Sequence, residues 1–414
     1  MFEHPEARKS IEFILSRGVT FEEMLKDGYF SNSILTKQAQ KMYMEKKNMK
    51  IIPQMEPLYD EEDKKAVTDY LNSDGWLMEH KHTEQLEKML CNITKAKYCS
   101  MVPNGTLSLT ASLVALGIKP GDEIIVPDYT IIATATSASF IGAKPVFVDV
   151  EPKTFAIDVN ELKKRITSKT KAIMLVHING RPARDWVEIL DLAQTEGIPV
   201  IEDAAQCLGS YYNVEHAKVH LGTLGVMGSF SFSMSKIVTM GCGGAIITDD
   251  AELHHTIELM KDFGREKGGR DVNIYPGIDL KFTDLQAVLG ISMLKRLDQR
   301  VKRKKEMYRL YEEELKNTVE MVDTNLKYTS PWFNDIMLRS RAQRIRLVMN
   351  LKENGVETRN FYPSITTQTP FEQTGFPVSR DVSSRGLWLP SSLKLSDDDI
   401  LYVCNKIKDT IKKS

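Results

Sequence analysis

Short apolar runs alternate with helix-like runs between about residues 51 and 290, and this alternation constrains the fold more than any other feature. Six of the short runs are strand candidates: EIIVPDY, PVFVDV, AIMLVHI, PVIEDAA, SFSFSM and GAIITDD. Their near-continuous apolar character is typical of strands that are buried on both faces of a parallel sheet. Helical runs such as TLSLTASLVALG and DWVEILDLAQTEG separate several of them. The pattern therefore predicts an α/β fold with a largely parallel sheet.

The length and the changes in sequence pattern predict one appendage and two domains. A chain of 414 residues is long enough for two domains that share a large core. Residues 1–50 are polar with helical spacing of their apolar residues, so we expect a helical N-terminal appendage there. Residues 51–295 form the predicted large α/β domain, and residues 296–414 a smaller α+β domain. One long helical pattern, at 284–315, crosses from the first domain to the second.

Charge and cysteine content exclude several classes of protein. With 55 basic and 56 acidic residues the net charge is −1, which argues against a nucleic-acid scaffold. No apolar run approaches the roughly 18 residues that a membrane span needs, and the N-terminus lacks the apolar core of a secretory signal. The five cysteines include no CxxC pair, so neither a disulfide framework nor a metal site is expected. We expect a cytoplasmic protein.

A helix start at Asn104-Gly105-Thr106 is a candidate anion site. Glycine lets backbone N–H groups approach a ligand, and the N-terminus of a helix favours negative charge. A phosphate group would fit such a position. The alternative is a plain helix cap that binds nothing.

A carboxylate and a lysine follow two of the predicted strands. Asp203 ends the run PVIED, where a buried charge needs a partner such as a protonated heterocyclic nitrogen. Lys236 lies among small and hydroxyl residues in GSFSFSMSKIVTMGCGG, with Ser231 and Ser235 close by. Burial would lower its pKa and make its amine nucleophilic. The alternatives are a helix cap for Asp203 and a solvent-exposed loop position for Lys236.

The three features together point to one cofactor. A phosphate site, a carboxylate for a pyridine nitrogen and a lysine amine are what a protein supplies to pyridoxal 5′-phosphate (PLP). Their order along the chain is that of the PLP-dependent aminotransferases of fold type I.

The chain also resembles a known family over residues 51–410. The segments LNSDGWL, NGTLSL, PGDEIIVPDYT, IGAKPVFVDVEPKTFAID, EDAAQ, GSFSFSMSK and GIDLKFTDLQAVLG are similar to motifs of the DegT/DnrJ/EryC1/StrS sugar aminotransferases. The resemblance implies a fold type I aminotransferase. Such a protein has a large domain with a mainly parallel mixed sheet between helices, and a smaller C-terminal α+β domain.

The resemblance also implies roles for single residues. Lys236 would bind the cofactor aldehyde covalently and then move a proton between the substrate and the cofactor. Asp203 would keep the pyridine nitrogen protonated, and Gln206 would lie beside the ring hydroxyl. Backbone groups of Gly105 and Thr106 would bind the phosphate, together with the hydroxyl of Ser231.

The segment GIDLKF, which contains Asp279, would reach the cofactor phosphate in the active site of a second subunit. The resemblance therefore implies a homodimer with shared active sites.

Several positions depart from the family pattern. Ile131 replaces the aromatic residue that usually stacks on the cofactor ring, and Asp279 replaces an asparagine. Asn179 stands where tyrosine is usual, and Cys242 where an acid is usual. The segment FYPSITTQTPF lacks a histidine often found there. Asp279 would be unfavourable beside a phosphate unless Lys281 neutralises it. We expect the changes together to affect the sugar pocket rather than cofactor binding, because Lys236, Asp203 and Ser231 remain.

The sequence thus predicts a PLP-dependent aminotransferase that aminates a keto sugar, specifically a nucleotide-linked 4-keto-6-deoxyhexose, with L-glutamate as amino donor. One alternative substrate is a small phosphorylated ketone. A sugar dehydratase of the same family is a second alternative, but such enzymes carry histidine where this chain has Lys236. A catalytically silent assembly partner is the third. No nucleic acid, membrane or metal is expected to take part.

Overall fold

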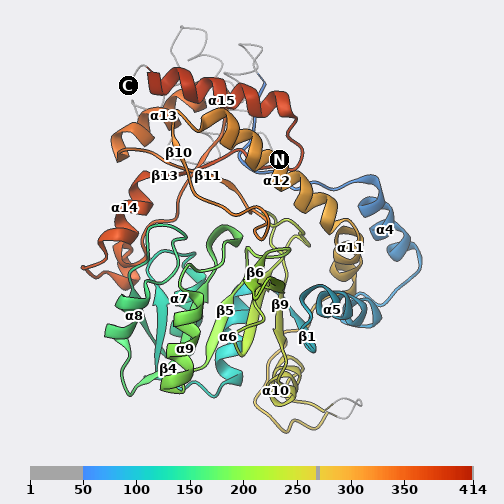
Figure 1. Ribbon diagram of the computed structural model, residues 1–414. Coiled ribbons are helices and arrows are strands. Elements are labelled where there is room, and N and C mark those ends of the chain that lie inside the picture. The colour runs from blue at the N-terminus through green and yellow to red at the C-terminus, as the bar shows by residue number, and fades with distance from the viewer. Residues whose placement is uncertain (1–49, 267–270, 413–414) are drawn as a thin grey trace, which may run out of the picture.

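The computed structural model describes residues 50–266 and 271–412. The appendage predicted at residues 1–50 therefore lies, apart from its last residue, outside the described part of the chain. Figure 1 shows the large sheet and its helices in the lower part of the view and the C-terminal elements, orange to red, above them. Within the described ranges no helix is both long and apolar enough to cross a membrane.

A seven-stranded sheet forms the centre of the larger part, in the order β1-β9-β8-β5-β4-β2-β3. Five strands from β8 to β3 run parallel, and β9 runs antiparallel to both of its neighbours. The strands are β1 (Tyr98–Val102), β2 (Glu123–Pro127), β3 (Lys144–Val148), β4 (Thr170–Val176), β5 (Val200–Asp203), β8 (Met227–Ser231) and β9 (Gly244–Thr248). The predicted mainly parallel mixed sheet is confirmed, and all six strand candidates take part in it.

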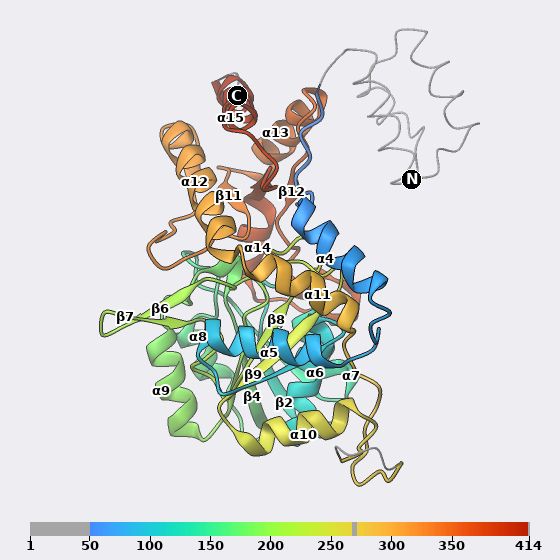
Figure 2. The same ribbon diagram turned by 90° about the vertical axis from the view of Figure 1, so that its right-hand side faces the viewer.

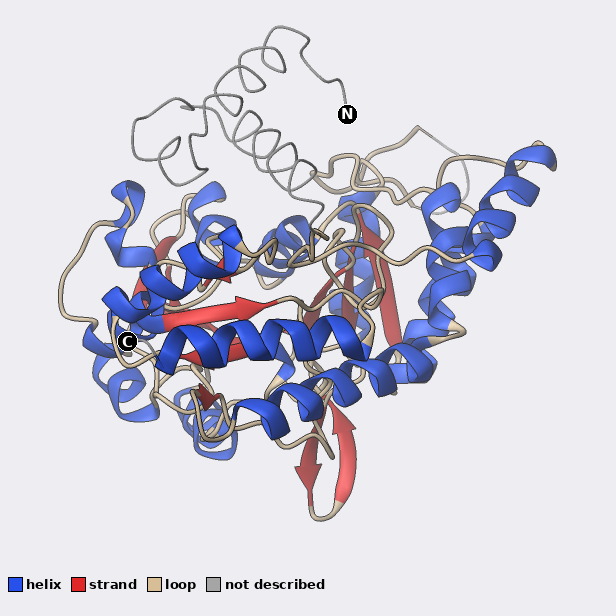
Figure 3. Cartoon of the chain, turned by 90° about the horizontal axis from the view of Figure 1, so that it is seen from above, coloured by secondary structure: helices blue, strands red, loops and turns tan. Residues whose placement is uncertain are grey.

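Figure 3 shows the molecule from above, with strands in red and helices in blue. Helices of the larger part lie on both faces of its sheet. They are α4 (Glu61–Asn72), α5 (Lys81–Thr94), α6 (Gly105–Ala115), α7 (Ala133–Phe140), α8 (Val159–Arg165), α9 (Trp186–Glu196), α10 (Ala251–Lys261) and α11 (Asp284–Leu294). Alternate residues of one strand serve opposite faces: Ile124 packs with α6 and α7, and Ile125 with α8 and α9. Both faces are therefore buried, which explains why the strands are apolar at successive positions.

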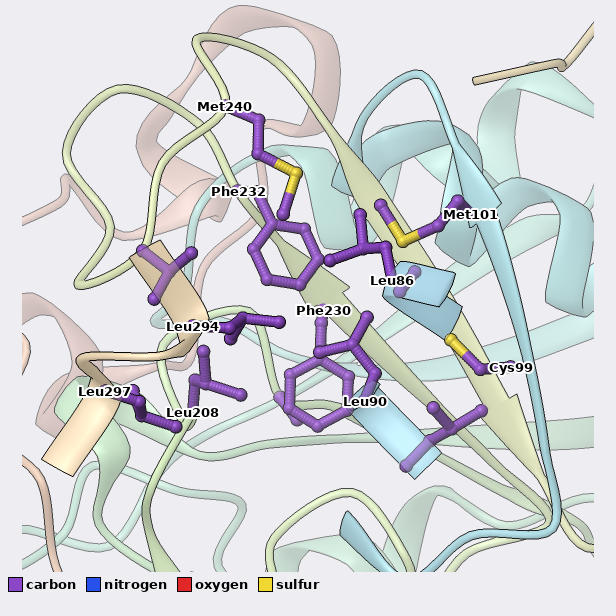
Figure 4. Close-up of a cluster of buried hydrophobic side chains, with 14 of the residues drawn as sticks. Leu86, Leu90, Cys99, Met101, Leu208, Phe230, Phe232, Met240, Leu294 and Leu297 are labelled. Atoms are coloured by element: carbon purple, nitrogen blue, oxygen red, sulfur yellow. The ribbon is translucent and has the colours of Figure 1, made fainter. Parts of the chain in front are cut away.

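A cluster of buried side chains joins the sheet to α5 and α11 (Figure 4). Leu86 and Leu90 of α5 are at most 1% exposed and lie in the same cluster as Phe230 and Phe232. Burying each side chain of this size stabilises the fold by about 1.5–3 kcal/mol. This cluster fixes the end of β8, from which the loop that carries Lys236 begins.

The C-terminal part contains an antiparallel sheet in the order β10-β11-β13-β12, covered by helices. Its elements are α12 (Leu297–Leu315), β10 (Glu320–Met321), β11 (Asn334–Met337), α13 (Arg341–Glu353), β12 (Arg359–Asn360), α14 (Pro377–Arg385), β13 (Gly386–Leu389) and α15 (Asp397–Lys412), with short 3₁₀ turns at Ile365–Thr367 and Thr369–Phe371. A third 3₁₀ turn, Ile178–Gly180, follows β4 in the larger part. A small hairpin, β6 (Tyr211–Val214) with β7 (Ala217–His220), projects from the larger part (Figure 2).

The two parts exchange short segments across the division predicted at residue 295. Ile52 packs in the core of the C-terminal part and pairs with Val356, with Glu357 N donating to Ile52 O at 2.9 Å. In the other direction, Ile365 and Phe376 pack in a core of the large sheet. Each part therefore needs a segment from the far side of that division to complete its core.

The single long helix expected at 284–315 is wrong, because the structure has two helices there. α11 ends at Leu294 and α12 begins at Leu297. Arg296 lies at the break, with φ −112° and ψ 18°, and its guanidinium pairs with Asp60 and Asp63 at the start of α4. The break directs α11 against α4 and α5, and α12 into the C-terminal core.

Candidate active site

A cavity of about 270 Å³ opens at the carboxyl ends of β5 and β8. This is where ligands bind in open α/β sheets. The lining residues are Asn104, Gly105, Thr106, Leu109, Ile131, Ala133, Asp203, Ala205, Ser231, Ser233, Ser235, Lys236, Trp332, Arg359 and Tyr362. Six of the eight predicted site residues are thus brought together, and Gln206 and Asp279 are not among the lining residues.

Lys236 projects from the loop between β8 and β9. Ser231 pairs with Gly244 across these antiparallel strands, so both ends of the loop are fixed to the sheet. The Nζ atom lies over the ring of Trp332, 4.2 Å from its centroid. Burial lowers the pKa of Lys236 to about 8, although the negative charge of Asp203 acts in the opposite direction. About half of the amine is therefore neutral near pH 8 and able to act as a nucleophile.

Asp203 is the last residue of β5 and is 3% exposed. Thr134 Oγ1 donates to its Oδ2 at 2.8 Å, and Ala205 N donates to its Oδ1 at 3.2 Å. Burial raises the pKa of Asp203, and these two hydrogen bonds only partly oppose the rise. A cation at this carboxylate would offset the cost of burying its charge, as a protonated ring nitrogen would.

The first turn of α6 borders the same cavity. Asn104 caps the helix by accepting from Leu107 N at 2.9 Å. A Cβ at Gly105 would lie 3.0 Å from the Cβ of Ser231, and one at Gly244 would lie 2.4 Å from the carbonyl oxygen of Asn104. Glycine at both positions lets the helix start and the end of β8 approach closely. Backbone N–H groups and the Ser231 hydroxyl then border one space suited to an anion.

Two other predicted site residues lie elsewhere. Gln206 lines a small adjoining cavity and accepts from Asn179 N at 2.6 Å. Asp279 is exposed and accepts from the backbone N–H of Lys281 at 3.1 Å. The Lys281 amine pairs with Asp262 at 2.7 Å instead of with Asp279. A role for Asp279 across a subunit interface stays a prediction.

Two departures from the family pattern have structural positions away from the cavity lining. Asn179 is fully buried at φ 59°, and its side chain bonds to Phe333 and Asp335 of the C-terminal part. It therefore joins the two parts of the chain, where we expected it to affect a sugar pocket. Cys242 is exposed, and its thiol donates to the carbonyl of Pro103 at 3.0 Å.

Sequence reasoning missed four residues of the site. Thr134 bonds to Asp203, and Trp332, Arg359 and Tyr362 bring the C-terminal part to the cavity. The Trp332 indole N–H donates to the carbonyl of Ser235 at 2.8 Å, which ties this wall to the lysine loop. Trp332, Arg359 and Tyr362 carry no local pattern, because only the docking of the two parts places them at the cavity.

The residues present fit PLP. The cavity combines a lysine with a lowered pKa, a buried carboxylate with no ion pair among the described residues, and the start of helix α6. In the described ranges, no group of three or more His, Cys, Asp or Glu is arranged to hold a metal ion.

Comparisons with known proteins find relatives over most of the chain. The DegT/DnrJ/EryC1/StrS aminotransferase family profile matches residues 57–408. A GDP-perosamine synthase from Escherichia coli O157:H7 is 32% identical over 364 residues, covering 87% of this chain and 99% of the relative. A dTDP-3-amino-3,6-dideoxy-alpha-D-galactopyranose transaminase from Aneurinibacillus thermoaerophilus is 32% identical, covering 84% of this chain and 95% of the relative.

Solved structures share the fold. An aminotransferase from Psychrobacter cryohalolentis has a TM-score of 0.80 at 26% identity, covering 86% of this chain and 98% of that one. A Streptococcus pneumoniae protein solved in its PLP form has a TM-score of 0.82 at 24% identity, covering 88% and 99% of the two chains. Together with the family match, these likenesses confirm a fold type I architecture. The chain belongs to the DegT/DnrJ/EryC1/StrS aminotransferase family and is a PLP-dependent transaminase.

Proposed function

We propose that this transaminase aminates a keto sugar, specifically a nucleotide-linked 4-keto-6-deoxyhexose, with L-glutamate as amino donor. The observation that carries the proposal is the presence of Lys236, Asp203 and the start of α6 around one cavity. Relatives that span nearly the same length include a GDP-perosamine synthase and a dTDP-linked amino sugar transaminase, which supports a nucleotide sugar as the acceptor.

The residues of the cavity would have separate roles in binding the cofactor and in transferring protons. When bound, PLP supplies an electron sink for the bonds at the substrate carbon. Asp203 would hold the proton on the ring nitrogen, and the start of α6 with Ser231 would bind the phosphate. Lys236 Nζ would accept a proton from the substrate carbon and return it. Its lowered pKa near 8 suits that task, because general acid–base groups work best with a pKa near the operating pH.

Product analysis tests the substrate. The purified protein, loaded with PLP, is incubated with L-glutamate and GDP-, dTDP- or UDP-linked 4-keto-6-deoxyhexoses, and the products are identified by mass spectrometry. We expect an amino sugar from at least one of these, and none from the Lys236→Ala variant. Amination of a small phosphorylated ketone, with every nucleotide sugar left unchanged, would overturn the proposal.

We also propose a homodimer in which the segment around Asp279 contributes to the partner's active site. Large apolar side chains are exposed on that segment and on the GWLM stretch, where Trp76 is 65% exposed and Ile278 is 56% exposed. Met78 and Thr283 form a bridge that places the two stretches side by side. Exposed apolar surface of this kind is typical of protein interfaces.

Sedimentation of the active enzyme tests the dimer, and an active monomer would contradict it.

Asp279→Asn should bind PLP equally well or more tightly, because it removes a negative charge from the expected neighbourhood of a phosphate. A sharp loss of activity in this variant would show that the carboxylate binds a substrate group instead.

A further inference from the structure

Helix α12 carries a lysine on the face that it buries in the C-terminal part. Lys304 is 2% exposed and shares this face with Met307, Tyr311 and Leu315, which belong to the core of that part. Among the described residues no carboxylate pairs with the Lys304 amine, and burial alone lowers its pKa to about 7. An amine at a core position costs stability unless it is hydrogen-bonded, so its bonding partners indicate what it does.

The Lys304 amine bonds to two main-chain carbonyl groups. Its Nζ atom donates to the carbonyl oxygen of Trp332 at 2.8 Å and to that of Ser391 at 2.5 Å. Trp332 lies just before β11, and Ser391 just after β13. The amine thus joins two segments of the C-terminal part, and it retains N–H donors for both bonds when it loses its proton.

The peptide group between Trp332 and Phe333 is held at both of its polar atoms. Its carbonyl oxygen accepts from Lys304, and its N–H, on Phe333, donates to Asn179 Oδ1 at 2.6 Å. These two atoms belong to one planar unit, so bonds at both of them fix its orientation. One partner comes from each part of the chain, and the direction in which the Trp332 side chain leaves the backbone depends on both.

The Trp332 ring connects this peptide group to the candidate active site. The ring lies over the Lys236 amine, with Nζ 4.2 Å from its centroid, and its indole N–H donates to the carbonyl of Ser235 at 2.8 Å. Lys304 itself is not among the residues that line the cavity. Rotation of the peptide group would move the ring away from the lysine loop and let water reach the Lys236 amine.

We propose that Lys304 is a positioning residue of the active site, whose bonds to the carbonyls of Trp332 and Ser391 keep the Trp332 ring over the Lys236 amine. The proposal rests on the role proposed above for Lys236, and it is independent of the sugar. Lys304 touches neither substrate nor cofactor, so it acts on the reaction only through Trp332. Loss of its amine should therefore have little effect once the Trp332 indole is also removed.

A double-mutant cycle tests this dependence. Wild type, Lys304→Met, Trp332→Phe and the double variant are mixed as holoenzymes with L-glutamate, and the change in cofactor absorbance gives the rate of the half-reaction. The same full-length proteins, freed of cofactor, are then given PLP between pH 6 and 10, and the midpoint of the capture rate reports the pKa of the Lys236 amine. Urea unfolding measures the stability of each variant. Lys302→Met, at an exposed lysine of the same helix, is the matched control.

We expect Lys304→Met to slow the half-reaction by roughly 10- to 100-fold, as for a small displacement of a group beside the reacting atoms. The midpoint of PLP capture should rise above its wild-type value of about 8, because water that reaches the amine reduces the effect of burial. Trp332→Phe should show both changes, and the double variant should lie within about threefold of Trp332→Phe. Lys304→Gln keeps an N–H donor and should lie between Lys304→Met and the wild type, and Lys302→Met should match the wild type.

Two results would overturn the proposal. A folded Lys304→Met with the wild-type rate and midpoint would show that Lys304 only stabilises the fold. Equal losses from Lys304→Met with and without Trp332→Phe would show that it acts by another route. If Lys304→Met does not fold, the same cycle with Lys304→Gln gives the same two tests.

Two further measurements separate this proposal from the function proposed above. Covalent capture of PLP by Lys236→Ala would refute the role of the Lys236 amine, and this proposal with it. If the wild type does not react with L-glutamate, the proposed donor is wrong, but the capture midpoints of the four proteins still decide the role of Lys304.

Discussion

Two lysines, the buried Lys261 and the partly buried Lys236, have opposite electrostatic surroundings in two regions of the molecule. Lys261, at the end of α10, is 1% exposed and lies 3.1 Å from Glu79, 3.5 Å from Glu258 and 3.6 Å from Glu87. Burial would lower the pKa of Lys261, but these three carboxylates, here called the Lys261 cluster, outweigh it and raise that pKa. At Lys236 burial prevails and the pKa falls to about 8.

The difference shows that burial alone does not make a lysine reactive. Both amines are removed from water, but only Lys261 has carboxylates within 4 Å among the described residues. The cavity holds its one lining carboxylate, Asp203, far enough from Lys236 that the two groups do not form an ion pair. An amine that has no carboxylate nearby can lose its proton near neutral pH. An amine surrounded by carboxylates stays protonated and has a structural role.

The largest expected effect is at the reactive lysine. Lys236→Ala should lower transamination by at least about 1000-fold, because it removes both the nucleophile and the proton carrier. Lys236→Arg should not restore activity, since a guanidinium stays protonated. Borohydride treatment followed by peptide mass mapping should find the cofactor on Lys236 in the wild type. Activity near the wild-type rate in the alanine variant would place the chemistry elsewhere.

Replacement of the other lysine should affect stability instead. Lys261→Met leaves three acidic groups without their cation and should lower the free energy of unfolding by about 3–5 kcal/mol. Urea denaturation measures this, with Lys88→Met, at an exposed lysine on α5, as the control. The activity of the fraction that stays folded should be close to wild type. A variant as stable as the control would mean that the cluster carries little net energy.

Replacement of Asp203 tests whether its carboxylate, which forms no ion pair with Lys236, is needed for transamination. Asp203→Asn keeps the shape and the acceptor for Thr134 but loses the charge that would hold a ring nitrogen protonated. We expect roughly a 100-fold loss of transamination and a smaller loss of PLP affinity. Both are measured on the same preparation, by a coupled assay and by fluorescence titration. Equal losses in the two quantities would make the residue structural.

The smallest expected effect is the pH dependence of the Lys261 cluster. Burial, supported by the charges of Glu258 and Glu79, raises the pKa of Glu87 to about 7 from 4.5, against the effect of Lys261. The folded protein then keeps a proton that the unfolded chain releases between pH 4.5 and 7. Stability from this group is full below pH 4.5 and is lost as the pH rises through 7.

The slope of this loss is at most about 1.4 kcal/mol per pH unit. Glu87→Gln should remove it, so the difference in unfolding free energy between wild type and variant should change with pH only inside that window. Urea titrations at pH 5 and 7.5 measure the change. A difference that is constant with pH would show that Glu87 is ionised in both states.

The strands and the reactive groups could be predicted because their signals are local. A run such as PVIED carries its own burial pattern, and Asp203 follows from its place at the end of that run. Strand β1, Tyr98–Val102, was missed because Cys99 and Ser100 interrupt its apolar character. Its burial comes from pairing with β9, which is far away in the sequence.

The residues that the C-terminal part brings to the site could not be predicted for a related reason. Arg359 belongs to a two-residue edge strand, too short for any periodicity, and Trp332 lies in a segment without a repeat. Their positions depend on how two cores dock, through contacts such as Asn179 with Asp335. Such contacts join residues that are far apart in the sequence, so no local pattern predicts them.

The local closure of the lysine loop has a consequence for biosynthesis of the enzyme. Pairing of Ser231 with Gly244 can form as soon as both strands are made, because few residues separate them. Trp332 and Arg359 leave the ribosome much later, and contacts between distant residues form slowly. The ring of Trp332 can therefore cover the amine only after the C-terminal part has been made. The cavity has all of its lining residues only after translation has passed Tyr362, so we expect cofactor to bind the complete chain rather than a nascent one.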